Sequence, residues 1–277
     1  MKFRFLGTGT SVGVPQIGCK CRVCTSKDPR DSRRRCGAWV SDGESAFLVD
    51  TPPELRLACV EYGIDKVDAV LLTHAHMDHV AAFDDLRRFN TINGERIPCD
   101  PNEPGANGRD YRIVGRTMKC YALPETIEQM HRIFPYISTK GGEKGLFRPQ
   151  IEFEDCSKPF KIGGISVESF PVEHGFPCCG YVIGSKIAYA SDCCDMADEV
   201  VERLKGIDTL VIDCLRKRFH PTHMNLEKVL GYIGRIAPRK AFLTHLCHDY
   251  THEEWLSMLP PGVSPAYDGL TLSFMAK

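Results

Sequence analysis

Short apolar segments separated by turn residues recur along this chain and predict β-strands. Cationic and aromatic side chains alternate over residues 2–6, and residues 36–41 and 45–50 flank Asp42-Gly43, a dipeptide typical of hairpin turns. Continuous apolar runs predict buried strands at 67–73, 209–213 and 241–244. Further short strands are expected at 151–153, 165–170, 179–183 and 186–190.

Helices are predicted between these strands from capping residues and from the helical spacing of apolar side chains. One helix follows Thr51-Pro52-Pro53 and ends at Gly63, and another begins after the N-cap Asn225 and ends before Pro238. The others are expected near residues 80–88, 123–134, 198–204 and 252–258. Because no regular βαβ alternation is present, a simple doubly wound sheet is not expected.

Two segments carry neither pattern. Residues 7–13 form a glycine-rich turn whose third glycine is one place late for a dinucleotide fingerprint, so we interpret it as structural. Residues 93–119 are polar and contain several prolines and glycines, which predicts a long inserted loop. Loops of this length tend to be lids or disordered segments.

The composition is that of an ordinary globular protein. The chain has 277 residues and a net charge of −1, which suits one domain over 1–277 and argues against a general nucleic-acid binder. It has no apolar run of membrane-spanning length and no signal peptide, and its 14 cysteines are irregularly spaced, so we expect a cytoplasmic protein without membrane contact. The run Arg33-Arg34-Arg35 is interpreted as a solvated face, with a phosphate-facing patch as the alternative.

Candidate chemistry is concentrated in His74-Ala75-His76-Met77-Asp78-His79, directly after a predicted strand. Residues two apart on an extended backbone point the same way, so His74 and His76 can bind one cation. Where the chain turns into a helix, Asp78 and His79 point to another side and can bind a second. Without metal, four such groups packed together would leave buried polar atoms unpaired. The motif therefore predicts two adjacent metal ions.

A second candidate metal site is Cys19-Lys20-Cys21-Arg22-Val23-Cys24. Three thiolates at this spacing can surround one soft cation, and tetrahedral zinc needs a fourth ligand. The alternative is three reduced surface cysteines, but such a cluster would be prone to oxidation.

The His-x-His-x-Asp-His motif resembles the signature of the metallo-β-lactamase superfamily. The resemblance implies an α/β fold, a four-layer αββα sandwich, whose further ligands each follow a strand. Here those ligands are His174, Asp192 and His245. It implies a bridging role for Asp192 between two metals, one held by His74, His76 and His174 and the other by Asp78, His79 and His245. Zinc, manganese or iron suits these ligands.

Gly7-Thr8-Gly9, Gly13-Val14-Pro15 and the cysteine cluster narrow the resemblance to PhnP-type phosphodiesterases, accessory enzymes of the carbon–phosphorus lyase system. The similarity spans nearly the whole chain. It implies a structural zinc bound by three cysteines and by a histidine three residues after the last catalytic ligand, namely Cys19, Cys21, Cys24 and His248. Cys247 is a rival ligand. The chain departs from the family in the longer 93–119 segment, which bears on substrate and partners.

The implied function is a metal-dependent phosphodiesterase. Two cations that share a water lower its pKa, so a bridging hydroxide is the expected nucleophile. The resemblance assigns His223 to phosphate contact or general-acid catalysis, with His220 as its rival, and we assign Asp78 a catalytic as well as a ligating role. It also suggests a small substrate, such as a cyclic nucleotide or a cyclic ribose phosphate, and a homodimer.

Three other functions share parts of this pattern. An RNase of the tRNA 3′-processing type has the same ligands but usually reaches RNA through a basic arm, whereas the charge of residues 93–119 is nearly balanced. An acyl hydrolase of lactams, lactones or thioesters often lacks one phosphodiesterase ligand, whereas Asp78 and His79 are both present. A non-catalytic metal-binding module has no need of seven ligands. We therefore expect a small phosphodiester, and no nucleic-acid partner.

Overall fold

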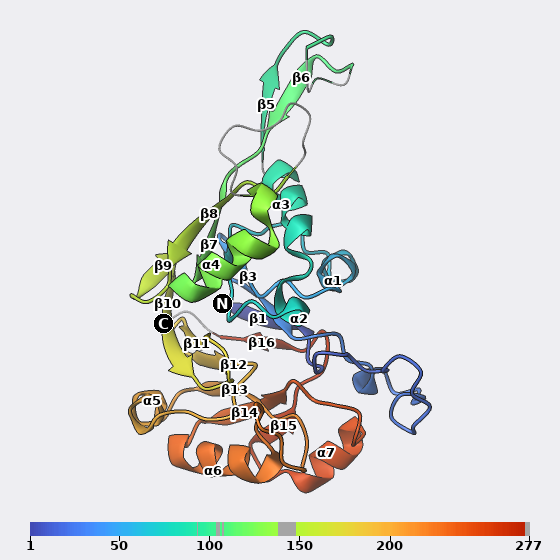
Figure 1. The fold of residues 1–277 in the computed structure, drawn as a ribbon, viewed down its shortest axis with the longest axis vertical. Coiled ribbons are helices and arrows are strands. Elements are labelled where there is room, and N and C mark those ends of the chain that lie inside the picture. The colour runs from blue at the N-terminus through green and yellow to red at the C-terminus, as the bar shows by residue number, and fades with distance from the viewer. Residues whose placement is uncertain (93, 104–105, 107, 138–147, 275–277) are drawn as a thin grey trace.

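Two seven-stranded sheets and a separate two-stranded sheet organise the described residues of this computed structural model, which are 1–92, 94–103, 106, 108–137 and 148–274 (Figure 1). The first sheet is mixed, with an antiparallel part at the N-terminal strands and a parallel part from β3 onward. Its strands in spatial order are β16 (Thr271–Ser273), β1 (Lys2–Gly7), β2 (Gly37–Ser41), β3 (Ala46–Val49), β4 (Ala69–Leu71), β7 (Met118–Ala122) and β8 (Ile151–Asp155).

The second sheet has the same mixed character, because β12 to β15 are parallel while β9 to β12 are antiparallel. Its strands in spatial order are β15 (Val263–Pro265), β14 (Lys240–Thr244), β13 (Thr209–Asp213), β12 (Ile187–Ala190), β11 (Cys178–Ile183), β10 (Ile165–Val172) and β9 (Phe160–Ile162).

Helices cover the outer face of each sheet, which gives the four layers expected from the resemblance (Figure 1). The first sheet carries α1 (Leu55–Glu61), α2 (Met77–Val80), α3 (Leu86–Ile92) and α4 (Pro124–Ile133), with the 3-10 turns η2 (Phe83–Asp85) and η3 (Pro135–Ile137) on the same half. The 3-10 turn η1 (Pro29–Asp31) contacts the first residues of α7. The second sheet carries α5 (Asp198–Leu204), α6 (Leu226–Ile236) and α7 (His252–Met258).

Side-chain alternation along the strands explains this layering. Phe47 and Val49 of β3 belong to the apolar cluster shared by the two sheets, whereas Leu48 packs with the helices outside. Val211 of β13 likewise enters the shared cluster, while its neighbours pack under α5 and α6. Strands buried on both faces are continuous apolar runs, which is why they were recognisable in sequence.

The 93–119 prediction of a long loop is wrong for residues 95–98, 111–114 and 118–119, which are strands. The segment contains β5 (Glu95–Pro98) and β6 (Tyr111–Val114), which pair with each other as an antiparallel hairpin, and it runs into β7. Residues 93, 104, 105 and 107 of this segment lie outside the described residues. The hairpin projects from the body beyond α3 (Figure 1).

The solvated-face interpretation of the arginine run is wrong for Arg33. This residue is 2% exposed and donates to Thr8 Oγ1 at 3.0 Å and to the Ala266 carbonyl oxygen. Arg34 and Arg35 form ion pairs with Glu61 and Glu54. The three arginines therefore connect the residues after β1 with the segments that carry Glu54, Glu61 and Ala266.

None of the helices in the part of the chain that the structure describes is long and apolar enough to cross a membrane.

Candidate metal centre

The carboxyl ends of parallel strands meet at one edge of each sheet, and the predicted ligands lie there. His74 and His76 follow β4, and His174 follows β10. His74 Nε2 is 3.0 Å from His76 Nδ1, and His174 Nε2 is 3.3 Å from the same atom. Nitrogen atoms bound about 2.0–2.1 Å from one tetrahedral metal would be roughly 3.3 Å apart. The three rings therefore have the spacing of a common metal site.

A second group lies beside the first. Asp78 and His79 come from α2, Asp192 follows β12, and His245 follows β14. Their ligand atoms all lie within 4.8 Å of one another. Asp192 Oδ2 is 3.0 Å from His79 Nε2, while Asp192 Oδ1 is 3.3 Å from His245 Nε2 and 3.7 Å from His174 Nε2. Asp192 thus stands between the two groups, in the place expected of a bridging ligand.

Hydrogen bonds on the far side of the rings leave nitrogen lone pairs facing the centre. His74 Nδ1 lies 2.9 Å from the Thr73 hydroxyl, which itself donates to Asp50. His79 Nδ1 is 2.8 Å from Asp50 Oδ2, and His174 Nδ1 is 2.9 Å from the Thr222 carbonyl oxygen. Since these partners accept, each Nδ1 carries the proton and each Nε2 is free to bind a cation.

Several buried polar atoms at the centre have no hydrogen-bond partner, and they show whether a metal would fit there. His79 Nε2, His245 Nε2 and Asp192 Oδ2 are all buried without a hydrogen-bond partner, although His79 and Asp192 are in close contact. Leaving such atoms unpaired in the interior costs free energy, and a coordinated cation would pair all three. The donor set and the unpaired atoms therefore fit two divalent cations.

Electrostatics prepare the two groups differently. Burial holds the pKa of His74 well below its usual value, and burial also lowers the pKa of His76 and His174, so this group is neutral. Burial would also lower the pKa of His79, but the charges of Asp192 and Asp50 outweigh it and hold that pKa well above its usual value. A divalent cation would replace the proton retained there.

His223 lies against both groups. Its ring centroid is 4.9 Å from that of His174 and 4.5 Å from that of His245. Its Nδ1 is 2.7 Å from Asp213 Oδ2, and burial lowers the pKa of His223 to about 4. The rival His220 lies one ring further out, 5.1 Å from His223, and contacts Thr222.

Two carboxylates in this arrangement were not singled out from the sequence. Asp50 follows β3 and contacts His79, and Asp213 ends β13 and contacts His223. Both are 0% exposed, and burial raises the pKa of each. The available signal was an aspartate at the carboxyl end of a buried strand, the same placement that marked Asp192.

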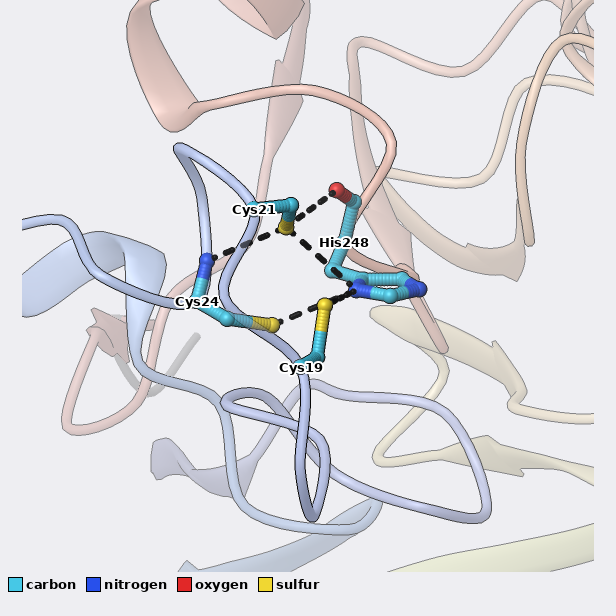
Figure 2. Close-up of side chains that lie close together, drawn as sticks. All are labelled: Cys19, Cys21, Cys24 and His248. Carbon is cyan, nitrogen blue, oxygen red and sulfur yellow. Dashed lines mark hydrogen bonds between the residues drawn. The ribbon is translucent and has the colours of Figure 1, made fainter.

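The cysteine cluster forms as well (Figure 2). His248 Nδ1 lies 3.3 Å from Cys19 Sγ, 3.6 Å from Cys21 Sγ and 3.2 Å from Cys24 Sγ. Sulfur and nitrogen bound to one tetrahedral zinc would be roughly 3.6 Å apart. The backbone N–H of Cys24 lowers the pKa of Cys21 to about 6, which favours its thiolate. The rival Cys247 is buried outside this group.

Comparisons with known proteins agree with this architecture. The family model described as "Beta-lactamase superfamily domain" matches residues 45–246. Among solved structures, a diphosphatase of the PhnP family has a TM-score of 0.83 and 33% identity, covering 99% of this chain and 98% of its own. The zinc-bound PqqB of Methylobacterium extorquens has a TM-score of 0.72 at 20% identity, covering 99% of this chain and 100% of its own, which shows the shared fold.

A curated relative carries a different name. The protein "Octanoyltransferase" of Porphyromonas gingivalis is 35% identical over 274 residues, which is 98% of this chain. This chain spans 51% of that relative's length.

Proposed function

The chain belongs to the metallo-β-lactamase superfamily, and we propose that it is a metal-dependent phosphodiesterase with a small substrate. The observation that carries this proposal is the position of His223, held by Asp213 beside both ligand groups. The active-site metals, zinc, manganese or iron, would be held by His74, His76, Asp78, His79, His174, Asp192 and His245. A structural zinc would be held by Cys19, Cys21, Cys24 and His248.

The proposed chemistry divides between metals and side chains. Two divalent cations, when bound, supply an activated water and positive charge for the phosphoryl oxygens. Asp213 fixes the Nδ1 edge of His223, so Nε2 on the opposite edge faces the leaving oxygen. In the doubly protonated ring, whose charge the Asp213 carboxylate would offset, the Nε2 proton can be donated to that oxygen; the neutral ring that remains keeps its Nδ1 proton. The Asp78 side chain is 13% exposed, against 2% for Asp192, so the Asp78 carboxylate is placed to accept a hydrogen bond from the attacking water.

Access to the centre suits a small substrate. His74, His79 and His245 are buried, whereas His76, Asp78 and His223 are partly exposed on the open side. Met77 and Phe219, at 55% and 78% exposure, stand on the segments that carry these three residues. Each ligand group therefore has a partly exposed member that a phosphodiester can reach, and so does His223.

The similarity to a PhnP-family diphosphatase supports phosphoryl chemistry at this site. A diphosphatase cleaves a phosphorus–oxygen–phosphorus bond, whereas the proposed substrate has a phosphorus–oxygen–carbon bond. Both reactions place negative charge on phosphoryl oxygens and on a leaving oxygen, so the same residues serve either.

Acyl hydrolysis is the second candidate, because a relative that contains this chain's counterpart is named an octanoyltransferase. That name applies to a protein about twice as long as this chain. The acyl transfer that it names could therefore reside in the half of the relative that this chain does not match.

Turnover of a substrate panel by the metal-replete protein separates these functions. The panel contains bis-p-nitrophenyl phosphate, a 2′,3′-cyclic nucleotide, a dinucleoside diphosphate and an octanoyl thioester. We expect the diesters to be hydrolysed at least about 100-fold faster than the thioester. The reason is that a thioester lacks the phosphate groups that the site would contact, and contacts of this kind contribute about that factor. Turnover of the thioester without turnover of any phosphate ester would identify an acyl hydrolase instead.

A further inference from the structure

His245 has a backbone conformation that its neighbours must hold. Its φ is +58°, in the left-handed region that a non-glycine residue rarely adopts. Such conformations persist where the surrounding structure over-determines them, and they cluster at functional sites. The orientation of this candidate ligand therefore depends on the segment that follows it.

The segment after His245 is bound on several sides. Leu246 donates its N–H to the Thr8 carbonyl oxygen at 3.0 Å, and its own carbonyl oxygen accepts from Thr10 at 3.2 Å. The N–H of Cys247 donates to the Leu215 carbonyl oxygen at 3.1 Å. His248 then enters the cysteine cluster, where three sulfur atoms surround its Nδ1 (Figure 2).

The segment that carries the cysteines also contacts residues that follow His248 in the chain. Arg22, between two of the cysteines, forms an ion pair with Glu254 of α7 at 2.5 Å and donates to the Asp249 carbonyl oxygen at 3.2 Å. Residues 19–24 therefore contact both His248 and the residues after it. Residues 245–248 are therefore fixed at one end by β14, which precedes His245, and at the other end by residues 19–24.

We propose that Cys19, Cys21, Cys24 and His248 form a positioning site for His245, so that metal bound at the cysteines increases metal affinity at the active-site position of Asp78, His79 and His245. The inference rests on the proposed metal function. It makes His248 and the cysteines positioning residues, because their atoms reach the active site only through the backbone of residues 245–248.

The two active-site positions should respond differently. His74, His76 and His174 come from β4 and β10, and their supporting contacts are Thr73 and the Thr222 carbonyl oxygen, away from the cysteines. The second position depends on His245. Loss of metal at the cysteines should weaken the second position by about 10–100-fold, as loss of an outer supporting group typically does, and leave the first unchanged.

Cobalt(II) titration of the full chain provides the test. Cobalt bound to thiolates has a sulfur charge-transfer band, which histidine and carboxylate sites lack, so binding at the cysteines can be followed by that band. The two active-site positions have different ligand sets and are followed as separate steps of the d–d absorption. We expect the C21S variant to show a weaker thiolate band, because two of the three sulfur ligands remain, and to bind cobalt at least tenfold more weakly at the second active-site position. The matched control is C247A, which removes the adjacent buried thiol and should titrate like the wild type.

Equal second-position affinity in C21S and wild type would overturn the proposal. If C21S fails to fold, E254Q keeps all four cluster side chains and removes the docking ion pair. E254Q should then lose second-position metal to a chelator faster than wild type, with the first position unchanged; equal release rates would likewise overturn the proposal. Because these readouts are metal affinities, absence of diester turnover would contradict the proposed function without deciding this inference.

Discussion

The His223 ring is held by a buried carboxylate, as that of His79 is, but it is more exposed than His79. Its Nδ1 is bound to a buried carboxylate at 2.7 Å, and its side chain is 11% exposed. In contrast, His74 and His79 are 0% exposed and face the other ligand atoms. A group that is oriented, close to the metals and accessible is suited to contact substrate.

Replacing His223 with alanine should separate chemistry from metal binding. We expect H223A to lose at least about 100-fold in kcat/KM for a phosphodiester, the usual contribution of a general acid, and to retain the wild-type metal content. Steady-state kinetics with metal analysis of the same sample measures both. The control is H220A, whose ring lies further out and whose loss should be smaller; wild-type turnover by H223A would remove His223 from the reaction.

Asp268 and Arg33 both contact the Thr8 hydroxyl, away from the metal centre. Asp268 accepts from Thr8 Oγ1 at 2.8 Å and from the backbone N–H of Arg34 at 2.7 Å. Burial raises the pKa of Asp268 to about 6, and burial lowers the pKa of Arg33 to about 10. Both shifts disfavour the charged forms, so the carboxyl group takes up a proton more readily in the folded state than in the unfolded chain.

The unfolding free energy should therefore decrease between pH 4 and pH 6 on account of Asp268. The folded state binds more protons than the unfolded state in this window, because the folded pKa of about 6 exceeds the ordinary 3.8, so stability falls as pH rises. The shift corresponds to about 3 kcal/mol at most. Denaturant unfolding of wild type and D268N in matched buffers should show the wild type losing stability relative to the variant across this range; a constant difference would contradict the assigned pKa.

At the scale of elements, the hairpin β5–β6 is set apart from the site. Its strands pair with each other as a separate sheet, and it supplies no residue to the two ligand groups or to the cysteine cluster among the described residues. Glu95 and Val114 are opposite each other at its base. The hairpin can therefore be shortened without moving the strands that carry ligands.

Replacing residues 96–113 with an Asn-Gly turn should leave the chemistry intact. The dipeptide closes two-residue hairpins, and it would connect Glu95 to Val114 directly. We expect kcat/KM for a small phosphodiester within about twofold of wild type, since no candidate catalytic group is removed. Substrate kinetics measures this; a loss above tenfold would show that the hairpin contacts small substrates.

Elements with strong local signals were predictable from sequence. The predicted ranges of α5, β13 and α7 agree with the structure, because each has apolar spacing and clear end signals. The strands β9, β15 and β16 were not predicted, since each has only three residues. In addition, β16 is defined by its pairing with β1 at the other end of the chain. The hairpin was missed because the prolines and glycines of its long connection hid two short strands.

At the scale of the whole molecule, the candidate centre depends on both sheets. The first sheet and α2 provide His74, His76, Asp78 and His79, and the second sheet provides His174, Asp192 and His245. Their placement after strands was readable from the sequence, and the structure brings them together. The contacts of Asp50 with His79 and of Arg33 with Thr8 join residues 25 or more positions apart. The strand-end placement of Asp50 and Asp213 was visible in the sequence, but it did not indicate which histidine each would contact.

Metal stoichiometry measured together with diester turnover tests the central claim most directly. Metal-free protein would be loaded stepwise while bound metal per chain and hydrolysis of bis-p-nitrophenyl phosphate are followed in the same sample. We expect about three metals per chain at saturation, one at the cysteines and two at the binuclear centre, with turnover rising as the two active-site positions fill. Full diester turnover by the metal-free protein, or no diester turnover once these positions are filled, would contradict the account.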